Sequence, residues 1–398
     1  MKAIGITAEY NPFHNGHRYH IEEARRISGA DAVVVCMSGN FVQRGGPAVC
    51  DKWTRAGWAL SHGADLVIEL PQAFASADAG RFACSAVSIL AQAGCNAVSF
   101  GSECADKELL KTVSQRTRLI RDEIPSFVKE HPGLSYPAAR TELYKETFAF
   151  SDSIDDELRI ISSPNDILAI EYISELSGLD FYPVKRLGAG YNQEFCSESG
   201  FQSASGIRKM VADGDLGISQ YMPSAVAENL SGEAFGAIER EFYRLAAYKI
   251  IEAGRGEIDN TPSGGEGLSS RLKEAVLNAE SLDELISLAK SKRYTFSRLS
   301  RLVTQLVLGI TRNNLVIDPS YIRVLGFTAR GRELLSEISR KSAIPVITNP
   351  SRQQKLLNDE GKRLLAIDSK ASDIYNLLCG SNLYRNSDYV KKPIIINS

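Results

Sequence analysis

The chain has 398 residues, more than one hydrophobic core usually organises, so two or three domains are expected. Its 43% hydrophobic and 24% charged residues are close to the averages for soluble globular proteins, which excludes wholesale disorder, collagen-like repeats and small disulfide-rich scaffolds. With 46 basic and 48 acidic residues the formal charge is −2, which gives no global sign of a nucleic-acid partner but can conceal a basic region.

The first hundred residues alternate between strand-like and helix-like patterns. Short apolar runs rich in β-branched residues predict buried strands, and segments with helical spacing lie between them. This alternation is typical of right-handed crossover units, so it predicts an α/β fold with an open, Rossmann-like parallel sheet. The predicted strands are Lys2–Ala8, Asp31–Met37, Asp65–Leu70 and Ala97–Phe100, and the predicted helices are Asn15–Ser28, Asp51–His62 and Ala75–Ala93.

The middle of the chain, residues 106–160, is charged and mostly helical, and we expect it to elaborate the sheet domain. Ser163 then opens a helix that runs to about Ser177, because the proline that follows it is favoured in a first turn. A last strand, Phe181–Leu187, and a further helix, Ser203–Ala212, complete this part of the prediction.

The pattern changes beyond about residue 220, where helical periodicity dominates. Four segments carry it, namely Glu233–Glu252, Leu268–Asn278, Leu282–Ser291 and Phe296–Ile310. We therefore place a domain boundary near Met222. Residues 1–222 are predicted to form the sheet domain and residues 223–398 a mainly α-helical C-terminal domain.

Polar or glycine-rich segments follow three of the predicted strands. They are Thr7–His17, Ser38–Asp51 and Gly101–Glu103. Open parallel sheets bind their ligands at the carboxyl ends of the strands, so these segments are expected to surround a ligand site.

The tetrapeptide His14-Asn15-Gly16-His17 lies at the first predicted strand-to-helix turn. A helix start offers unpaired N–H groups and the positive end of a dipole, and both attract phosphate. Imidazole donors placed there can offset charge that develops on phosphate oxygens during displacement at an α-phosphate, and Gly16 allows a nucleotide to approach the backbone. The alternative is an ordinary pair of histidines at a helix start. His20, one turn further on, is explained equally well as packing over the site.

This turn resembles the HxGH signature of the nucleotidylyltransferase superfamily. A second segment, Ser203 to Arg208, resembles the late serine-rich motif of the same superfamily, which opens a helix and binds ATP phosphates. In that reading Ser203 or Ser205 caps the helix with its hydroxyl, and Arg208 presents a fork of donors to the β- and γ-phosphates.

Further segments extend the resemblance to the bacterial tRNA(Met) cytidine acetate ligases and cover most of the chain. They are Gly5–His17, Met37–Gly45, Asp51–Arg55, Ser163–Asn165, Lys185–Arg186, Ser203–Arg208 and Lys292–Thr295. The resemblance implies an enzyme that converts ATP and acetate to acetyl-adenylate and pyrophosphate. The acetyl group then passes to the wobble cytidine of elongator tRNA(Met), giving N(4)-acetylcytidine and AMP.

The resemblance also implies the residues of the site. The implied catalytic residues are His14, His17, Ser205 and Arg208. The implied ATP-binding residues are Thr7, Ala8, Glu9, Tyr10, Asn11, Pro12, Phe13, His14, Asn15, Gly16, His17, Arg18, Tyr19, His20, Gly101, Asn165, Arg186 and Ser203. No protein metal site is predicted, although Mg²⁺ is expected to hold the leaving pyrophosphate. Without the resemblance, Asn165 is explained equally well as a helix cap, and Arg186 as a surface residue.

Acetate is small, so its pocket needs a cationic grip and a methyl-sized apolar wall. The segment after the second strand offers Arg44 or Lys52 as the cation and Phe41 or Trp53 as the wall. The tryptophan is also explained as a core or interface residue.

A basic region is present at residues 285–345, where 11 basic and 3 acidic residues give a net charge of 11 − 3 = +8. Lys290, Arg293, Arg298 and Arg301, with Tyr294 and Phe296 between them, would supply phosphate contacts and stacking surfaces for the tRNA. The alternative is a solvated helix face. The second functional hypothesis is an adenylyltransferase that joins AMP to a small phosphate ester, and such an enzyme does not need this basic region. A third hypothesis, an RNA-binding module without catalytic activity, would leave both phosphate-binding motifs unused.

The remaining expectations concern the setting of the protein. No stretch approaches the ~18 apolar residues of a membrane span, and no secretory pattern is recognised, so a cytoplasmic location is expected. The seven cysteines lack metal or redox spacing and are expected to be reduced thiols. The apolar helices of the C-terminal part suggest a homodimer.

Overall fold

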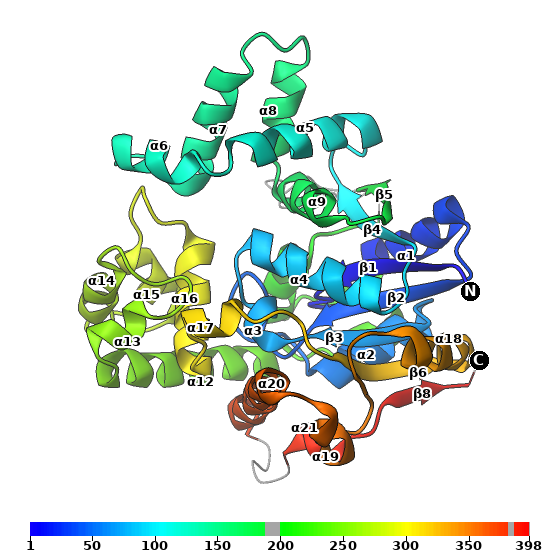
Figure 1. Ribbon diagram of the computed structural model, residues 1–398. Coiled ribbons are helices and arrows are strands. Elements are labelled where there is room, and N and C mark those ends of the chain that lie inside the picture. Colours follow the sequence, from blue (N-terminus) through cyan, green and yellow to red (C-terminus); the bar gives the residue numbers. More distant parts are fainter. Residues whose placement is uncertain (188–199, 381–385, 398) are drawn as a thin grey trace.

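The computed structural model describes residues 1–187, 200–380 and 386–397. Within them one eight-stranded sheet has the order β5-β4-β1-β2-β3-β6-β7, with β8 paired to β6 (Figure 1). The first five strands are parallel, and β6 runs antiparallel to β3. This confirms the predicted α/β, Rossmann-like fold. The strands are β1 (Ala3–Ala8), β2 (Ala32–Ser38), β3 (Leu66–Leu70), β4 (Ala97–Ser102), β5 (Asp180–Lys185), β6 (Ile322–Thr328), β7 (Val346–Ile347) and β8 (Ile394–Ile396).

The helices of the first part follow the predicted spacing with one exception. The pattern predicted one helix from Ala75 to Ala93, but α3 and α4 form instead, because the Asp78 carboxylate caps the second helix by accepting from the N–H of Arg81 at 3.1 Å. The helices are α1 (Asn15–Ser28), α2 (Lys52–Ser61), α3 (Gln72–Ala75), α4 (Ala79–Gln92), α5 (Lys107–Ile120), α6 (Ile124–Glu130), α7 (Tyr136–Thr147), α8 (Ile154–Ser162), α9 (Pro164–Glu175) and α10 (Ala204–Ala212). In Figure 1, α5 to α8 lie together above α9 and β4.

The C-terminal part is mainly helical, as expected, but it also supplies β6, β7 and β8. The sequence pattern did not indicate β6, because Arg323 and Gly326 interrupt its apolar run. Gly326 is required there, since a Cβ would lie 2.9 Å from the carbonyl oxygen of Ile394 in β8. The helices are α11 (Ser224–Ala227), α12 (Gly232–Glu252), α13 (Arg255–Asp259), α14 (Leu268–Ala275), α15 (Leu282–Ala289), α16 (Phe296–Leu308), α17 (Arg312–Leu315), α18 (Ala329–Lys341), α19 (Pro350–Gln353), α20 (Asp359–Leu378) and α21 (Ser387–Val390), with 3₁₀ turns at Leu216–Gln220 and Gln354–Leu356.

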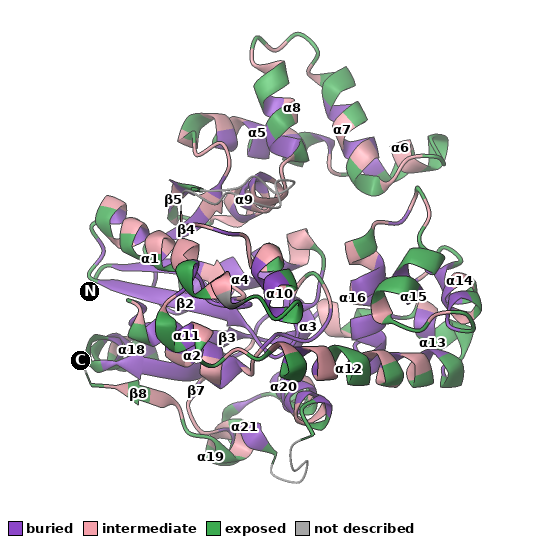
Figure 2. Ribbon diagram, turned by 180° about the vertical axis from the view of Figure 1, so that it is seen from behind, coloured by how far each residue is buried: buried purple, intermediate pink, exposed green. Residues whose placement is uncertain are grey.

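Both faces of the sheet are covered. Alternate residues of the strands point to opposite faces, so Val34 and Ile68 pack on one side and Val33 and Val67 on the other. The first cluster continues through α4 and α9 into α12, α16 and α20, and the second lies under α1, α2 and α10. The central strands are accordingly almost wholly buried (Figure 2). The helices on both sides of Met222 therefore share a hydrophobic core with the sheet.

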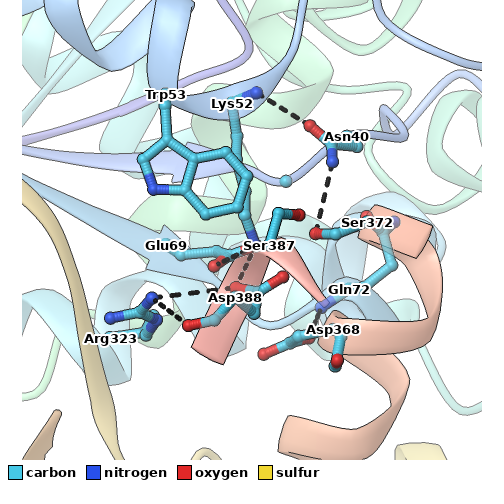
Figure 3. A network of polar contacts seen from close by, with 12 residues as sticks. Asn40, Lys52, Trp53, Glu69, Gln72, Arg323, Asp368, Ser372, Ser387 and Asp388 are labelled. Carbon is cyan, nitrogen blue, oxygen red and sulfur yellow. Dashed lines mark hydrogen bonds and ion pairs between the residues drawn. The ribbon is translucent and has the colours of Figure 1, made fainter. Parts of the chain in front are cut away.

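A buried ionic cluster, formed by Lys52, Glu69, Arg323 and Asp388, joins the C-terminal residues to the sheet (Figure 3). The Lys52 Nζ lies 2.6 Å from Glu69 and 2.8 Å from Asp388, and its side chain is 0% exposed. The guanidinium of Arg323 donates to the Asp388 carbonyl oxygen at 3.1 Å. Lys52 is thus fully engaged, and it is not available to grip acetate as the sequence suggested.

Candidate active site

The predicted strand-to-helix turn is built around two stacked histidines. The rings of His14 and His17 have centroids 3.6 Å apart, and the N–H of His14 donates to Nδ1 of His17 at 3.3 Å. Gly16 makes this possible, because a Cβ there would lie 2.9 Å from the His14 ring. The turn therefore brings both imidazoles to the start of α1, at the carboxyl end of β1.

A cavity of about 280 Å³ opens over this turn. It lies at the carboxyl ends of β1, β4 and β5, where the strand order changes direction on either side of β1. Ligands of open α/β sheets bind in such a crevice.

Most of the residues predicted to bind ATP line this cavity. They are Thr7, Ala8, Glu9, Tyr10, Asn11, His14, Gly16, His17, Tyr19, His20, Gly101, Asn165, Arg186 and Ser203. Four others support or flank the turn: Pro12 and Phe13 are buried beneath it, Asn15 donates to the carbonyl oxygens of Gly200 and Gln220, and Arg18 forms a surface ion pair with Glu22. Their ATP-binding roles stay predictions.

Burial keeps the site histidines neutral. Burial, assisted by the charge of Arg186, lowers the pKa of His14 to about 3 and that of His20 to about 4, and burial together with His14 places the pKa of His17 well below its ordinary 6.5. Each neutral ring has one donor and one acceptor nitrogen. Nδ1 of His14 and the hydroxyl of Tyr10 are buried without a hydrogen-bond partner among the described residues, so both can bond a polar ligand.

Glu103, to which the sequence analysis assigned no role, holds the side chains on the cavity wall opposite the histidine turn. Its carboxylate accepts from Nδ2 of Asn165 at 2.5 Å and from the N–H of Asp166 at 3.0 Å, and it lies 4.0 Å from Nε of Arg186. Asp166 in turn accepts from the Ser102 hydroxyl and from the N–H of Glu103. Glu103 thus holds two predicted ATP ligands. The sequence offered one indication of this role, namely that Glu103 directly follows β4, in the segment Gly101–Glu103 that was expected at the ligand site.

The late serine-rich motif lies against the histidine turn. Ser203 caps α10, because its hydroxyl accepts from the N–H of Gly206 at 3.1 Å, and it also lies 3.1 Å from the hydroxyl of Ser205. Nη1 of Arg208 donates to the carbonyl oxygen of Asn11 at 2.8 Å. The two motifs, almost two hundred residues apart in the sequence, therefore meet at one site, and the cap is Ser203 and not Ser205.

The loop after β2 contributes Gln43 and Arg44 to the cavity wall. The N–H of Gln43 donates to Oε1 of Glu9 at 2.8 Å. Phe41 and Trp53, proposed from the sequence as walls of an acetate pocket, are buried and do not line the cavity. Of the four residues proposed for the acetate pocket, Arg44 is the one that lines the cavity.

The basic segment is only partly exposed. Tyr294 is 6% exposed and donates its hydroxyl to the carbonyl oxygen of Glu266, so the expectation that it stacks on RNA bases is wrong. Arg293 and Arg298 pair with the Glu266 carboxylate at 3.3 and 3.4 Å. Glu266 lies outside the basic segment in the sequence, but the fold places it beside these two arginines. The charges that remain exposed at this turn are Lys290 and Lys292, and Phe296 beside them is 41% exposed.

Other expectations concern metals, thiols and membranes. Within the described ranges, no cluster of three or more His, Cys, Asp or Glu could hold a metal ion. Cys36, Cys50, Cys84, Cys95, Cys104 and Cys379 are free thiols, and Cys196 lies outside the described residues. In the part of the chain that the structure describes, no helix combines the length and apolar character needed to cross a membrane.

Comparison with known proteins finds relatives over the whole chain. Residues 1–389 match the family described as HIGH Nucleotidyl Transferase. A tRNA(Met) cytidine acetate ligase of Acetivibrio thermocellus is 39% identical over 96% of both chains. One of Clostridium perfringens is 37% identical, over 99% of this chain and 100% of its own.

Two solved structures of Thermotoga maritima TmcAL are also similar, each at 31% identity and covering 100% of both chains. The apo form has a TM-score of 0.91. The form bound with alpha-thio ATP has a TM-score of 0.89.

Proposed function

Since the chain belongs to the tRNA(Met) cytidine acetate ligase family, we propose that it activates acetate with ATP and acetylates the wobble cytidine of elongator tRNA(Met). The products are N(4)-acetylcytidine, AMP and pyrophosphate. The observation that carries the proposal is that the histidine turn and the start of the Ser203–Arg208 motif line one cavity at the carboxyl end of β1. Ser205 and Arg208 do not line it, but Arg208 is bonded to the carbonyl oxygen of Asn11, which does. The alpha-thio ATP bound to T. maritima TmcAL supports ATP as the nucleotide.

In the first step, an acetate oxygen attacks the α-phosphorus of ATP and pyrophosphate leaves. The transition state concentrates negative charge on the phosphate oxygens. Neutral His14 and His17 donate N–H groups to these oxygens, and the positive end of α1 adds to the stabilisation. Arg186, which lines the cavity, and Arg208, which donates to the Asn11 carbonyl oxygen, would offset the charge of the leaving group.

In the second step, the N4 amine of cytidine attacks the acetyl carbonyl carbon and AMP leaves. No covalent enzyme intermediate is required, because the acetyl phosphate anhydride is already activated. The residues that hold the adenylate, including Asn165 and Arg186, would keep the carbonyl in place for the incoming amine.

The proposed Mg²⁺ fits a cavity of this kind. Mg²⁺ often keeps several water ligands and binds through substrate phosphates plus one or two carboxylates. In the described residues, the cavity has no dedicated cluster of metal ligands, so the phosphates of ATP would hold the ion. When bound, it neutralises charge on the leaving pyrophosphate.

The deciding experiment incubates the purified protein with radiolabelled acetate, ATP and bulk bacterial tRNA, followed by nucleoside analysis. We expect label in N(4)-acetylcytidine that depends on ATP. If no nucleoside is labelled and pyrophosphate is released only when a phosphate ester is added, the proposal is overturned in favour of an adenylyltransferase. The same preparation, analysed by light scattering, tests the homodimer suggested by the sequence.

A further inference from the structure

Glu9 is an unexpected residue in this cavity. Among the lining residues that the structure describes, it is the sole carboxylate, whereas Arg44, Lys185 and Arg186 supply positive charge. ATP and acetate are both anions, and a carboxylate repels them. A negative group at this position is suited to the Mg²⁺ that accompanies ATP, or to a partner that donates a hydrogen bond or a proton.

The carboxylate is held at a defined position. Glu9 directly follows β1, and the N–H of Gln43 donates to its Oε1 at 2.8 Å. Its backbone is fixed as well, because the buried guanidinium of Arg55 donates to the Glu9 carbonyl oxygen at 2.6 Å and to that of Ser38 at 3.2 Å. Glu9 therefore lies where β1 and β2 end, between the histidine turn and the loop of Arg44. The Oε1 atom is anchored by this hydrogen bond, and among the described residues no hydrogen bond reaches Oε2.

The acetyl-transfer step calls for such a group. The lone pair of the cytidine N4 amine is delocalised into the ring, so the amine is a weak nucleophile. When it attacks a carbonyl it acquires positive charge and has to lose a proton before the intermediate can collapse to an amide. General bases that take a proton in this way contribute typically ~10²–10⁴-fold to the rate.

We propose that Glu9 is the general base of acetyl transfer to the tRNA. This inference rests on the proposed function. As the N4–carbon bond forms, Oε2 of Glu9 accepts a proton from N4. The bond between the acetyl carbon and the phosphate oxygen then breaks, AMP leaves with that electron pair, and Glu9 returns its proton to solvent. The family resemblance placed Glu9 among the ATP contacts, whereas this role assigns it to the cytidine.

Glu9→Gln separates this role from a structural one. The amide oxygen of glutamine can still accept from the N–H of Gln43, so the anchor of the loop is kept and only the basic group is removed. Glu22→Gln is the matched control, because it replaces a carboxylate by an amide on α1, where Glu22 forms a surface ion pair outside the cavity. Glu9→Asp keeps a carboxylate and should restore part of the activity.

Two half-reactions are measured. Acetate-dependent ATP–pyrophosphate exchange without tRNA reports adenylation, and single-turnover transfer from enzyme-bound acetyl-adenylate to added tRNA reports the second step. In Glu9→Gln we expect transfer to slow by ~10²–10⁴-fold while exchange changes by less than about tenfold.

Equal losses in the two half-reactions overturn the inference, since Glu9 would then serve ATP or its metal. Transfer at the wild-type rate in Glu9→Gln overturns it as well. The proposed function fails in a different way, when wild-type protein forms no acetylcytidine at all. Matching unfolding curves for Glu9→Gln and Glu22→Gln establish that the variant is folded.

Discussion

At the scale of single residues, the site depends on partners that hold the ligand-facing groups. Glu103 shows this most directly, since a carboxylate can only accept hydrogen bonds and so determines which edge of the Asn165 amide faces it. The same carboxylate is close to Arg186. Without it, both side chains would lose a defined orientation before ATP binds.

We therefore expect Glu103→Ala to raise the KM for ATP about tenfold, equivalent to about 1.4 kcal/mol of binding, with a smaller change in kcat. ATP–pyrophosphate exchange over a range of ATP concentrations measures this. Glu103→Gln should recover part of the loss, because its amide oxygen can accept from Asn165. Glu108→Ala, an exposed position in the first turn of α5, is the control, and an equal effect there would contradict the role of Glu103.

Arg44 is the cation on the cavity wall that lies next to Gln43 and hence beside Glu9. A guanidinium suits a carboxylate because it offers a planar fork of donors. Arg44→Ala should raise the acetate concentration needed for half-maximal exchange by about tenfold or more, with little change in the KM for ATP. Arg26→Ala, at an exposed pair on α1, is the control. An unchanged acetate dependence would remove Arg44 from the acetate site.

The lowered pKa of His14 makes stability depend on pH. Its folded pKa of about 3 is below its ordinary 6.5, so the unfolded chain binds more protons between these values, and stability is lost as the pH falls below about 6.5. One such group contributes a slope of about 1.4 kcal/mol per pH unit. Urea unfolding of His14→Gln between pH 4.5 and 7.5 should show a slope smaller by about that amount. Equal slopes in the wild type and in His14→Gln would contradict the lowered pKa of His14.

At the scale of elements, helix α16 supports the loop that carries Arg44. Gly45 lies so close to this helix that a Cβ would be 2.5 Å from the backbone of Ser300, and the N–H of Gly46 donates to the Thr304 hydroxyl at 2.7 Å. The turn before α16 carries the exposed lysines of the basic segment. The surface expected to meet tRNA is therefore one helix away from the cavity wall.

Lys290→Ala with Lys292→Ala should weaken tRNA binding and reduce the salt dependence of the dissociation constant by about two phosphate contacts. Acetate-dependent exchange without tRNA should be unchanged, because neither lysine lines the cavity. The control is Lys355→Ala with Lys362→Ala, two exposed lysines outside residues 285–345. Equal weakening in the control pair would place the tRNA surface elsewhere.

At the scale of the whole molecule, the buried ionic cluster ties the last described residues to the centre of the sheet. Lys52 and Arg323 balance Glu69 and Asp388. A further acid, Asp368, has a pKa raised by burial and by the neighbouring Glu69, and it accepts hydrogen bonds from the N–H of Gln72 and the hydroxyl of Tyr321. Two cations face two anions in the cluster, and removing one anion leaves a charge buried without a partner.

Asp388→Asn should therefore lower the free energy of unfolding by about 3–5 kcal/mol, measured by chemical denaturation. Asp318→Asn is the matched control, because Asp318 is 88% exposed in its pair with Arg81, and a surface pair of this kind contributes at most about 1 kcal/mol. Similar losses in the two variants would show that the buried cluster adds nothing beyond a surface pair.

The sequence by itself was sufficient for the features that depend on local order. Periodicity placed the helix at Asn15–Ser28 and the first five strands, since burial on a sheet or one helix face leaves a pattern among neighbours. The histidine turn and the Ser203–Arg208 motif were recognisable for the same reason, because each is contiguous.

The tertiary structure alone decided the features that join distant residues. Arg323 in β6 is buried beside Asp388, Lys52 is removed from the acetate site by partners from two other elements, and Tyr294 is covered by the segment of Glu266. Glu103 and Glu9 gain their places in the same way, through Asn165 and Gln43. Burial and pairing of a charge depend on what the fold brings within a few ångströms, and such contacts leave no periodic trace in the chain.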